Sequence, residues 1–102
     1  MLKVIIKKYD SKIKKINLLG HADYNSYGKD IVCSSASSIV ITTVNALMMF
    51  DKTYITYEEK KDNFIIVINK NDKIVDTLIQ NMINMFRELE NDYPKNIKIE
   101  EE

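Results

Sequence analysis

The chain has 102 residues, of which 45% are hydrophobic and 29% are charged, and this is the composition of one soluble globular domain covering residues 1–102. Its 15 basic side chains balance its 15 acidic ones, so it lacks the positive surplus typical of nucleic-acid-binding proteins, and no direct nucleic-acid binding is expected. Its apolar runs are shorter than the ~20 residues of a membrane helix, and a single cysteine cannot form an internal disulfide, so we expect a cytoplasmic protein without a membrane segment.

The first part of the chain has the pattern of a β-hairpin. Over residues 2–7, Leu2, Val4 and Ile6 alternate with Lys3, Ile5 and Lys7. Turn-forming residues follow at 9–12, and apolar residues return over residues 13–18. The periodicity then stops over residues 22–29, which are polar, turn-prone or aromatic. This segment is predicted to be a loop of about eight residues, longer than most connections between elements.

A long amphipathic helix is predicted after the loop. From Ile31 to Phe50, apolar residues recur at spacings of three and four, so they lie on one face of a helix. Asp30 precedes them, and its carboxylate can accept an amide hydrogen bond from the first turn. Asp30 is therefore the expected N-cap, and the helix begins directly after the loop.

The rest of the chain repeats the pattern of a hairpin followed by a helix. Residues 54–59 and 64–69 indicate two strands joined by a turn. Residues 74–89 indicate a second amphipathic helix after a polar cap at 71–72, and residues 97–99 indicate a short last strand. The order ββαββαβ predicts an α+β fold, a two-layer sandwich in which a mostly antiparallel sheet of about five strands carries both helices on one face.

The only histidine and the only cysteine lie on either side of the predicted loop. Gly20 permits close backbone approach beside His21, and Cys33 lies in the first helical turn, where amides and the helix dipole favour a thiolate and can lower the thiol pKa. If the ends of the loop lie side by side, the imidazole and the thiol can form a nucleophile and base pair. The sulfur would attack a carbonyl, the imidazolium would protonate the leaving amine, and helix-start amides, including that of Cys33, would hold the oxyanion.

Other interpretations of these residues exist. A lone cysteine in a helix is often a small buried hydrophobe, and Asp30 can orient the imidazole as well as cap the helix. A phosphate-binding loop would need an arginine soon after Cys33, but the only arginine is Arg87. A zinc site needs more ligands than one histidine and one cysteine, and a redox switch lacks a resolving cysteine. We therefore expect no metal and no cofactor, and acyl transfer remains.

The stretch GHADYNSYGKDIVCSSASS, residues 20–38, resembles the signature of the bacterial ribosomal-processing cysteine protease family, Prp. That signature is Gly-His-Ala, a short variable loop, Gly-x-Asp-x-Val-Cys, and then small residues with a serine one turn on. The chain length and element order also fit the family. The resemblance implies a cytoplasmic, homodimeric cysteine endopeptidase, with Cys33 as nucleophile and His21 as general base and acid. It would remove the N-terminal extension of a large-subunit ribosomal protein.

The resemblance also implies where the substrate peptide binds. Family cleavage follows an aromatic residue in an apolar segment, which suits a groove formed by the loop and by small serines at the helix start. The residues expected to form the loop and bind substrate are Gly20, Tyr24, Tyr27, Gly28, Ser34 and Ser37. We expect the loop to be mobile without substrate and ordered by it, although the two tyrosines can instead pack it down. An alternative of another class is a non-catalytic ribosome-assembly or binding module that holds the same segment without cutting it.

Overall fold

The computed structural model describes residues 1–26 and 28–102. Along the chain the helices and strands are β1 (Leu2–Tyr9), β2 (Lys12–Leu19), α1 (Ile31–Phe50), β3 (Ile55–Lys60), β4 (Asn63–Ile68), α2 (Lys73–Asp92) and β5 (Ile97–Glu101). This order confirms the predicted succession ββαββαβ. The second helix is longer at both ends than its apolar pattern indicated, and the last strand is longer at its C-terminal end, because polar residues extend them.

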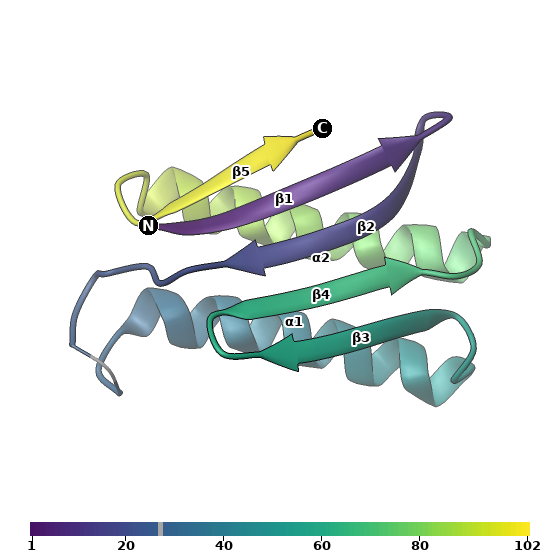
Figure 1. The fold of residues 1–102 in the computed structure, drawn as a ribbon, viewed down its shortest axis with the longest axis horizontal. Helices are drawn as coiled ribbons and strands as arrows, with labels where there is room; N and C mark the ends of the chain where they lie inside the picture. The colour runs from purple at the N-terminus through teal and green to yellow at the C-terminus, as the bar shows by residue number, and fades with distance from the viewer. Residues whose placement is uncertain (27) are drawn as a thin grey trace.

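The strands form one five-stranded sheet in the order β3-β4-β2-β1-β5. Neighbouring strands are antiparallel, except that β5 runs parallel to β1 with Ile97 opposite Leu2. Figure 1 shows both helices on the same face of this sheet, with β5 at one edge beside β1. The predicted two-layer α+β sandwich with a mostly antiparallel sheet is therefore confirmed.

The core lies between the sheet and the two helices. Alternate residues of the central strands point into it, including Val4, Ile6 and Ile16, which are fully buried. Phe86 and Met82 of α2 fill the space opposite them and are also fully buried. Burial of a side chain of this kind contributes about 1.5–3 kcal/mol, so the alternation in the strands and the helical stripe together account for the layer packing.

Helix α1 has apolar residues on more than its buried side. Its buried residues are Val32, Ala36, Val40, Thr43, Val44 and Leu47. Length and composition alone would allow α1 to cross a membrane, but the same is true of core helices in soluble proteins. Here one side of α1 packs into the core, while Ile41 and Met49 on the other side are exposed. The outward apolar residues therefore belong to the surface of the sandwich.

The β2–β4 pairing brings distant parts of the chain together at one end of the sheet. Leu19 at the end of β2 lies opposite Asn63 at the start of β4. The amide of Gly20 then donates a hydrogen bond of 2.9 Å to the carbonyl oxygen of Asp62, in the turn between β3 and β4. Gly20 has φ +86°, and a Cβ there would lie 2.9 Å from the carbonyl oxygen of Met1. Glycine thus allows the chain to leave β2 between β1 and the β3–β4 turn.

Candidate active site

A cavity of about 800 Å³ lies at this end of the sheet, between the β3–β4 turn and the start of α1. Both His21 and Cys33 line it. Other lining residues expected from the sequence are Gly20, Gly28, Asp30, Ser34 and Ser37. The fold therefore brings the ends of the loop to one cavity, as the proposed pair requires.

Asp30 joins the start of α1 to the loop. Its Oδ1 accepts hydrogen bonds of 3.0 Å from the amides of Val32 and Cys33, and its Oδ2 accepts from Tyr24 at 2.9 Å and Asn25 at 3.4 Å. Burial by itself raises the pKa of Asp30, but these four amide bonds outweigh burial and hold the pKa below its usual value. Within the described residues, Asp30 makes no hydrogen bond or ion pair with His21, so here it acts as the helix cap.

Cys33 is half-buried, and its Sγ accepts a hydrogen bond of 3.3 Å from the amide of Ala22. Burial raises the pKa of the Cys33 thiol, the Ala22 amide lowers it, and the negative charge of Asp30 raises it further. The prediction of a lowered thiol pKa is therefore wrong for this structure. The main reason is burial of the sulfur, and in addition the Asp30 carboxylate already occupies the positive end of the helix, where a thiolate would otherwise be stabilised.

The Asp30 cap also engages the backbone amide of Cys33. The amide of Cys33 was expected to be free to hold an oxyanion. In the structure it donates to Asp30 Oδ1 at 3.0 Å. An acceptor of formal negative charge holds an amide strongly, so the Cys33 amide is not available to a reacting carbonyl oxygen.

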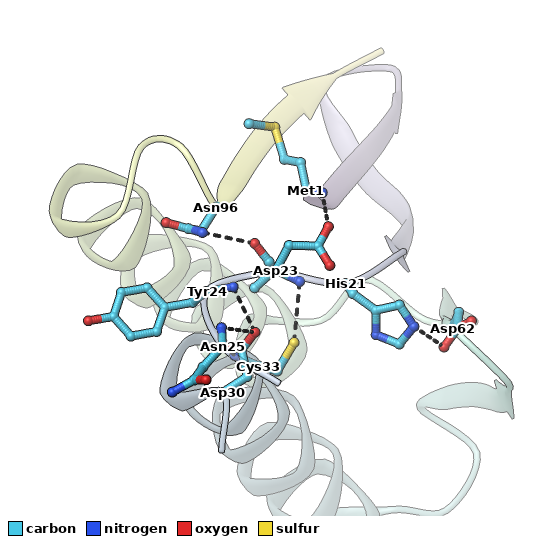
Figure 2. Close-up of polar contacts among 10 residues, drawn as sticks. Met1, His21, Asp23, Tyr24, Asn25, Asp30, Cys33, Asp62 and Asn96 are labelled. Carbon is cyan, nitrogen blue, oxygen red and sulfur yellow. Dashed lines mark hydrogen bonds and ion pairs between the residues drawn. The ribbon is translucent and has the colours of Figure 1, made fainter. Parts of the chain in front are cut away.

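His21 turns toward the β3–β4 turn. Its Nε2 lies 2.7 Å from Oδ1 of Asp62, and both side chains are partly exposed to solvent. In Figure 2 the other ring nitrogen, Nδ1, lies on the side of the ring toward Cys33. In the part of the chain that the structure describes, no hydrogen bond connects the imidazole to Sγ. Asp62 was missed from the sequence, where it was only one of several turn residues; its nearness to His21 depends on strand pairing.

The loop is attached to the fold at its start (Figure 2). Ala22 is buried, and its carbonyl oxygen accepts a hydrogen bond of 3.0 Å from Asn96 Nδ2. The amino group of Met1 forms an ion pair of 3.0 Å with Asp23. The Tyr24 ring packs edge-on against Tyr93, with ring centroids 5.2 Å apart. These contacts hold the first residues of the loop, and ordering of the loop by substrate stays a prediction.

The predicted substrate residues have different positions. Ser37 lines the cavity from the exposed side of α1, and Ser34 lines it while its Oγ donates to the carbonyl oxygen of Asp30 at 3.0 Å. Tyr24 is not one of the described residues that line the cavity, because its ring packs against Tyr93 instead. Tyr27 lies outside the described residues. Tyr24 therefore does not form part of the substrate groove in this structure.

Apolar residues that the sequence did not assign to the site also line the cavity. They are Leu2, Leu18, Ala36, Val40, Ile41 and Phe64. Glu59 and Lys60, at the end of β3, contribute charged side chains. Apart from Lys60, which was assigned to the turn, each of these residues was assigned to a strand or a helix by its periodicity, and nothing local marked it as part of a cavity.

Comparisons with known proteins show which family this chain resembles. A family model described as "Cysteine protease Prp" matches residues 1–98. Ribosomal processing cysteine protease Prp from Staphylococcus aureus is 29% identical over 93 residues, which are 88% of each protein. The crystal structure of the S. aureus protease with a covalently linked product peptide superimposes with a TM-score of 0.93 at 27% identity, covering 100% of both chains. The structure with a substrate peptide gives 0.88 at 26%, with the same coverage.

Proposed function

Because the chain belongs to the Prp family of cysteine proteases, whose model matches residues 1–98, we propose that it removes the N-terminal extension of a large-subunit ribosomal protein. The related S. aureus protease is named for ribosomal processing, and its structures contain a substrate peptide and a covalently linked product peptide. The observation that carries the mechanism is that His21 and Cys33 line one cavity on this chain. In this proposal Cys33 is the nucleophile and His21 is the general base and acid.

The reaction begins with the neutral thiol. Because the pKa of the Cys33 thiol is raised, the proton moves from Sγ to the imidazole as the substrate binds, not in a resting ion pair. The amide of Ala22, which donates to Sγ, stabilises the thiolate while the proton leaves. This step requires His21 Nδ1 to come within hydrogen-bond reach of Sγ in the substrate complex.

The covalent steps follow the chemistry of acyl transfer. Sγ forms a bond to the carbonyl carbon of the scissile peptide, and the tetrahedral intermediate collapses as the C–N bond breaks. The imidazolium of His21 gives its proton to the leaving amine. Water then attacks the thioester, with the imidazole accepting its proton, and the thiol of Cys33 is restored as the carboxylic acid product leaves.

The cavity suits an extended apolar peptide. Its apolar side is formed by strand and helix residues such as Leu18 and Phe64, and Ser37 adds a small polar side chain one helical turn after Cys33. An apolar side chain next to the cleaved bond would be desolvated against this surface, while the small side chains at the helix start leave room for the peptide backbone. These features support an apolar segment as substrate.

The test is cleavage of a synthetic peptide that copies the N-terminal extension, followed by mass spectrometry. Cys33→Ala and His21→Ala are expected to abolish product formation. Ser38→Ala, on the exposed side of the same helix, should retain activity and serves as the control. Undiminished cleavage by either site variant would disprove the mechanism, and stoichiometric binding of intact peptide by the wild type would favour a binding module instead.

The proposal includes a cytoplasmic homodimer without membrane or nucleic-acid partners. Apart from Ile41, which lines the cavity, three large apolar residues on α1 are exposed, namely Ile31, Met49 and Phe50, and a second copy could cover them. The balanced charge and the single free cysteine support the absence of nucleic acid and a reducing compartment. Sedimentation equilibrium tests the dimer: Met49→Glu should shift the mass toward that of one 11.9 kDa chain.

A further inference from the structure

Asp62 contacts the histidine that the proposed function uses as its base. The distance from Asp62 Oδ1 to His21 Nε2 is 2.7 Å. An ionised carboxylate has no proton to donate, so the proton in this contact belongs to Nε2. In the neutral imidazole, Nδ1 is then the nitrogen that can accept a proton, and Figure 2 shows it on the Cys33 side of the ring.

The backbone holds Asp62 in this position. Asn63, the next residue, pairs with Leu19, and the carbonyl oxygen of Asp62 accepts the amide of Gly20, the residue before His21. Asp62 itself has φ +60°, a left-handed conformation that aspartate and asparagine adopt more readily than most residues. The carboxylate and the imidazole thus extend from two chain segments that are already hydrogen-bonded to each other.

The other carboxylates around the cavity have different partners. Asp30 uses both of its oxygens on four backbone amides, and Asp23 is paired with the amino group of Met1. Glu59 lines the cavity without an ion pair to His21 among the described residues. Asp62 is therefore the carboxylate that the described fold brings to the imidazole.

We propose that Asp62 is the positioning residue for His21, so that Cys33, His21 and Asp62 act as a triad in the order nucleophile, base and orienting carboxylate. The inference rests on the assignment of Cys33 and His21 in the proposed function. A third group that holds the ring sets which nitrogen is protonated and which faces the nucleophile. Because both side chains are about half exposed, with 51% and 40% relative exposure, solvent screens their attraction, and orientation is the main effect.

Kinetics of peptide cleavage by Asp62→Ala test the role directly. We expect kcat to fall about 10- to 100-fold, less than the ~10⁴-fold seen when a buried triad carboxylate is changed, with KM changed less than about twofold. Asp62→Asn keeps the left-handed turn, which asparagine tolerates, but its NH2 group can donate to Nε2 and favour the other imidazole tautomer, so its kcat should fall as well. Asp10→Ala is the matched control, since Asp10 has φ +54° in the turn between β1 and β2.

A second readout needs no substrate. His21 is the only histidine of the chain, so its ring gives one imidazole signal in a ¹³C relaxation experiment. The ring order parameter should fall in Asp62→Ala and stay unchanged in Asp10→Ala. This measurement separates failure of the inference from failure of the proposed function, because it reports the position of the ring even if the peptide is not cut.

The following results would overturn the proposed role of Asp62. They are an unchanged kcat in Asp62→Ala, an equal loss in Asp10→Ala, a loss confined to KM, and an unchanged ring order parameter. A rise in kcat would also overturn it, since the contact would then restrain His21 away from the thiol. Thermal unfolding of each variant identifies any loss that comes from misfolding, and Asp62→Asn, which keeps the turn, provides the comparison in that case.

Discussion

Replacing Asp30 by alanine is expected to destabilise the protein more than replacing Asp72, the cap of the other long helix. Both aspartates cap helices of 20 residues. Asp72 accepts one backbone hydrogen bond, from the amide of Val75 at 3.0 Å, whereas Asp30 accepts four and connects the helix to the loop. The difference between the two variants therefore measures how much Asp30 contributes by holding the loop.

The magnitude follows from these contacts. Loss of a helix cap costs about 0.5–2 kcal/mol, and Asp72→Ala, which removes one backbone hydrogen bond, should give the smaller loss of the two. Asp30 is buried, with 7% relative exposure, and its Oδ2 also holds loop amides. A hydrogen bond to a charged group contributes about 1.5–3 kcal/mol, so together with the loss of the cap Asp30→Ala should cost roughly 2–5 kcal/mol. This corresponds to a fall in Tm on the order of 10–40 °C for a domain of this size.

Urea unfolding of the two variants at pH 7 gives both free energies. Native-state hydrogen exchange should show faster exchange of the Tyr24 and Asn25 amides in Asp30→Ala, and no change there in Asp72→Ala. Equal destabilisation by the two substitutions, with unchanged exchange at both amides, would refute the reasoning. The loop would then be held by its other contacts, at Ala22 and Asp23.

The contribution of Asp30 should also depend on pH. Its pKa in the folded protein is lowered, so between the two pKa values the unfolded chain binds more protons than the folded protein. The stabilisation is fully present above the unfolded pKa of about 3.9 and is lost as the pH falls through the lower folded pKa. The stability difference between wild type and Asp30→Asn should therefore shrink in urea titrations below about pH 4.

Three further predictions concern the thiol, the glycines and the core. Alkylation of Cys33 by iodoacetamide should be half-maximal at a higher pH than alkylation of a free thiol, because burial and the Asp30 charge raise the pKa of the Cys33 thiol. Asp30→Asn should lower the pH of half-maximal alkylation. An unshifted pH profile in this variant would count against the Asp30 charge as a cause. Gly20→Ala should destabilise the protein more than Gly28→Ala. Both positions need a left-handed backbone, which costs an alanine about 1–2 kcal/mol, but only at Gly20 does the new Cβ also meet a backbone atom, the Met1 carbonyl oxygen 2.9 Å away. Comparable urea midpoints for the two variants would contradict this prediction. Phe86→Ala should cost about 3–5 kcal/mol in urea unfolding, because Phe86 is fully buried, and a loss under 1 kcal/mol would show that the core repacks.

Much of the architecture was predictable because its causes are local. Alternation in the hairpins and a three-and-four spacing in the helices reflect which side of each element faces the core, and this information is present in neighbouring residues. Asp30 is an example: an acidic residue directly before an apolar helical stripe predicted the start of α1, and the structure places its carboxylate on the amides of the first turn.

The site was predictable only in part. His21 and Cys33 could be proposed as partners because a loop between a strand end and a helix start can bring its ends together. The pKa of Cys33 was predicted in the wrong direction, since the helix start alone favours a thiolate, whereas in the folded protein Asp30 and burial oppose it. The outcome depended on where one carboxylate and the surrounding chain lie in three dimensions.

The sequence by itself determined the elements, their buried sides, the helix cap at Asp30 and the pair of residues that carries the proposed chemistry. The tertiary structure decided the strand order β3-β4-β2-β1-β5, the apolar wall of the cavity and the contact between Asp62 and His21. The physical reason is that periodicity and capping act between residues a few positions apart. The Asp62 contact instead requires β4 to pair with β2, which joins residues more than 40 positions apart, such as Leu19 and Asn63.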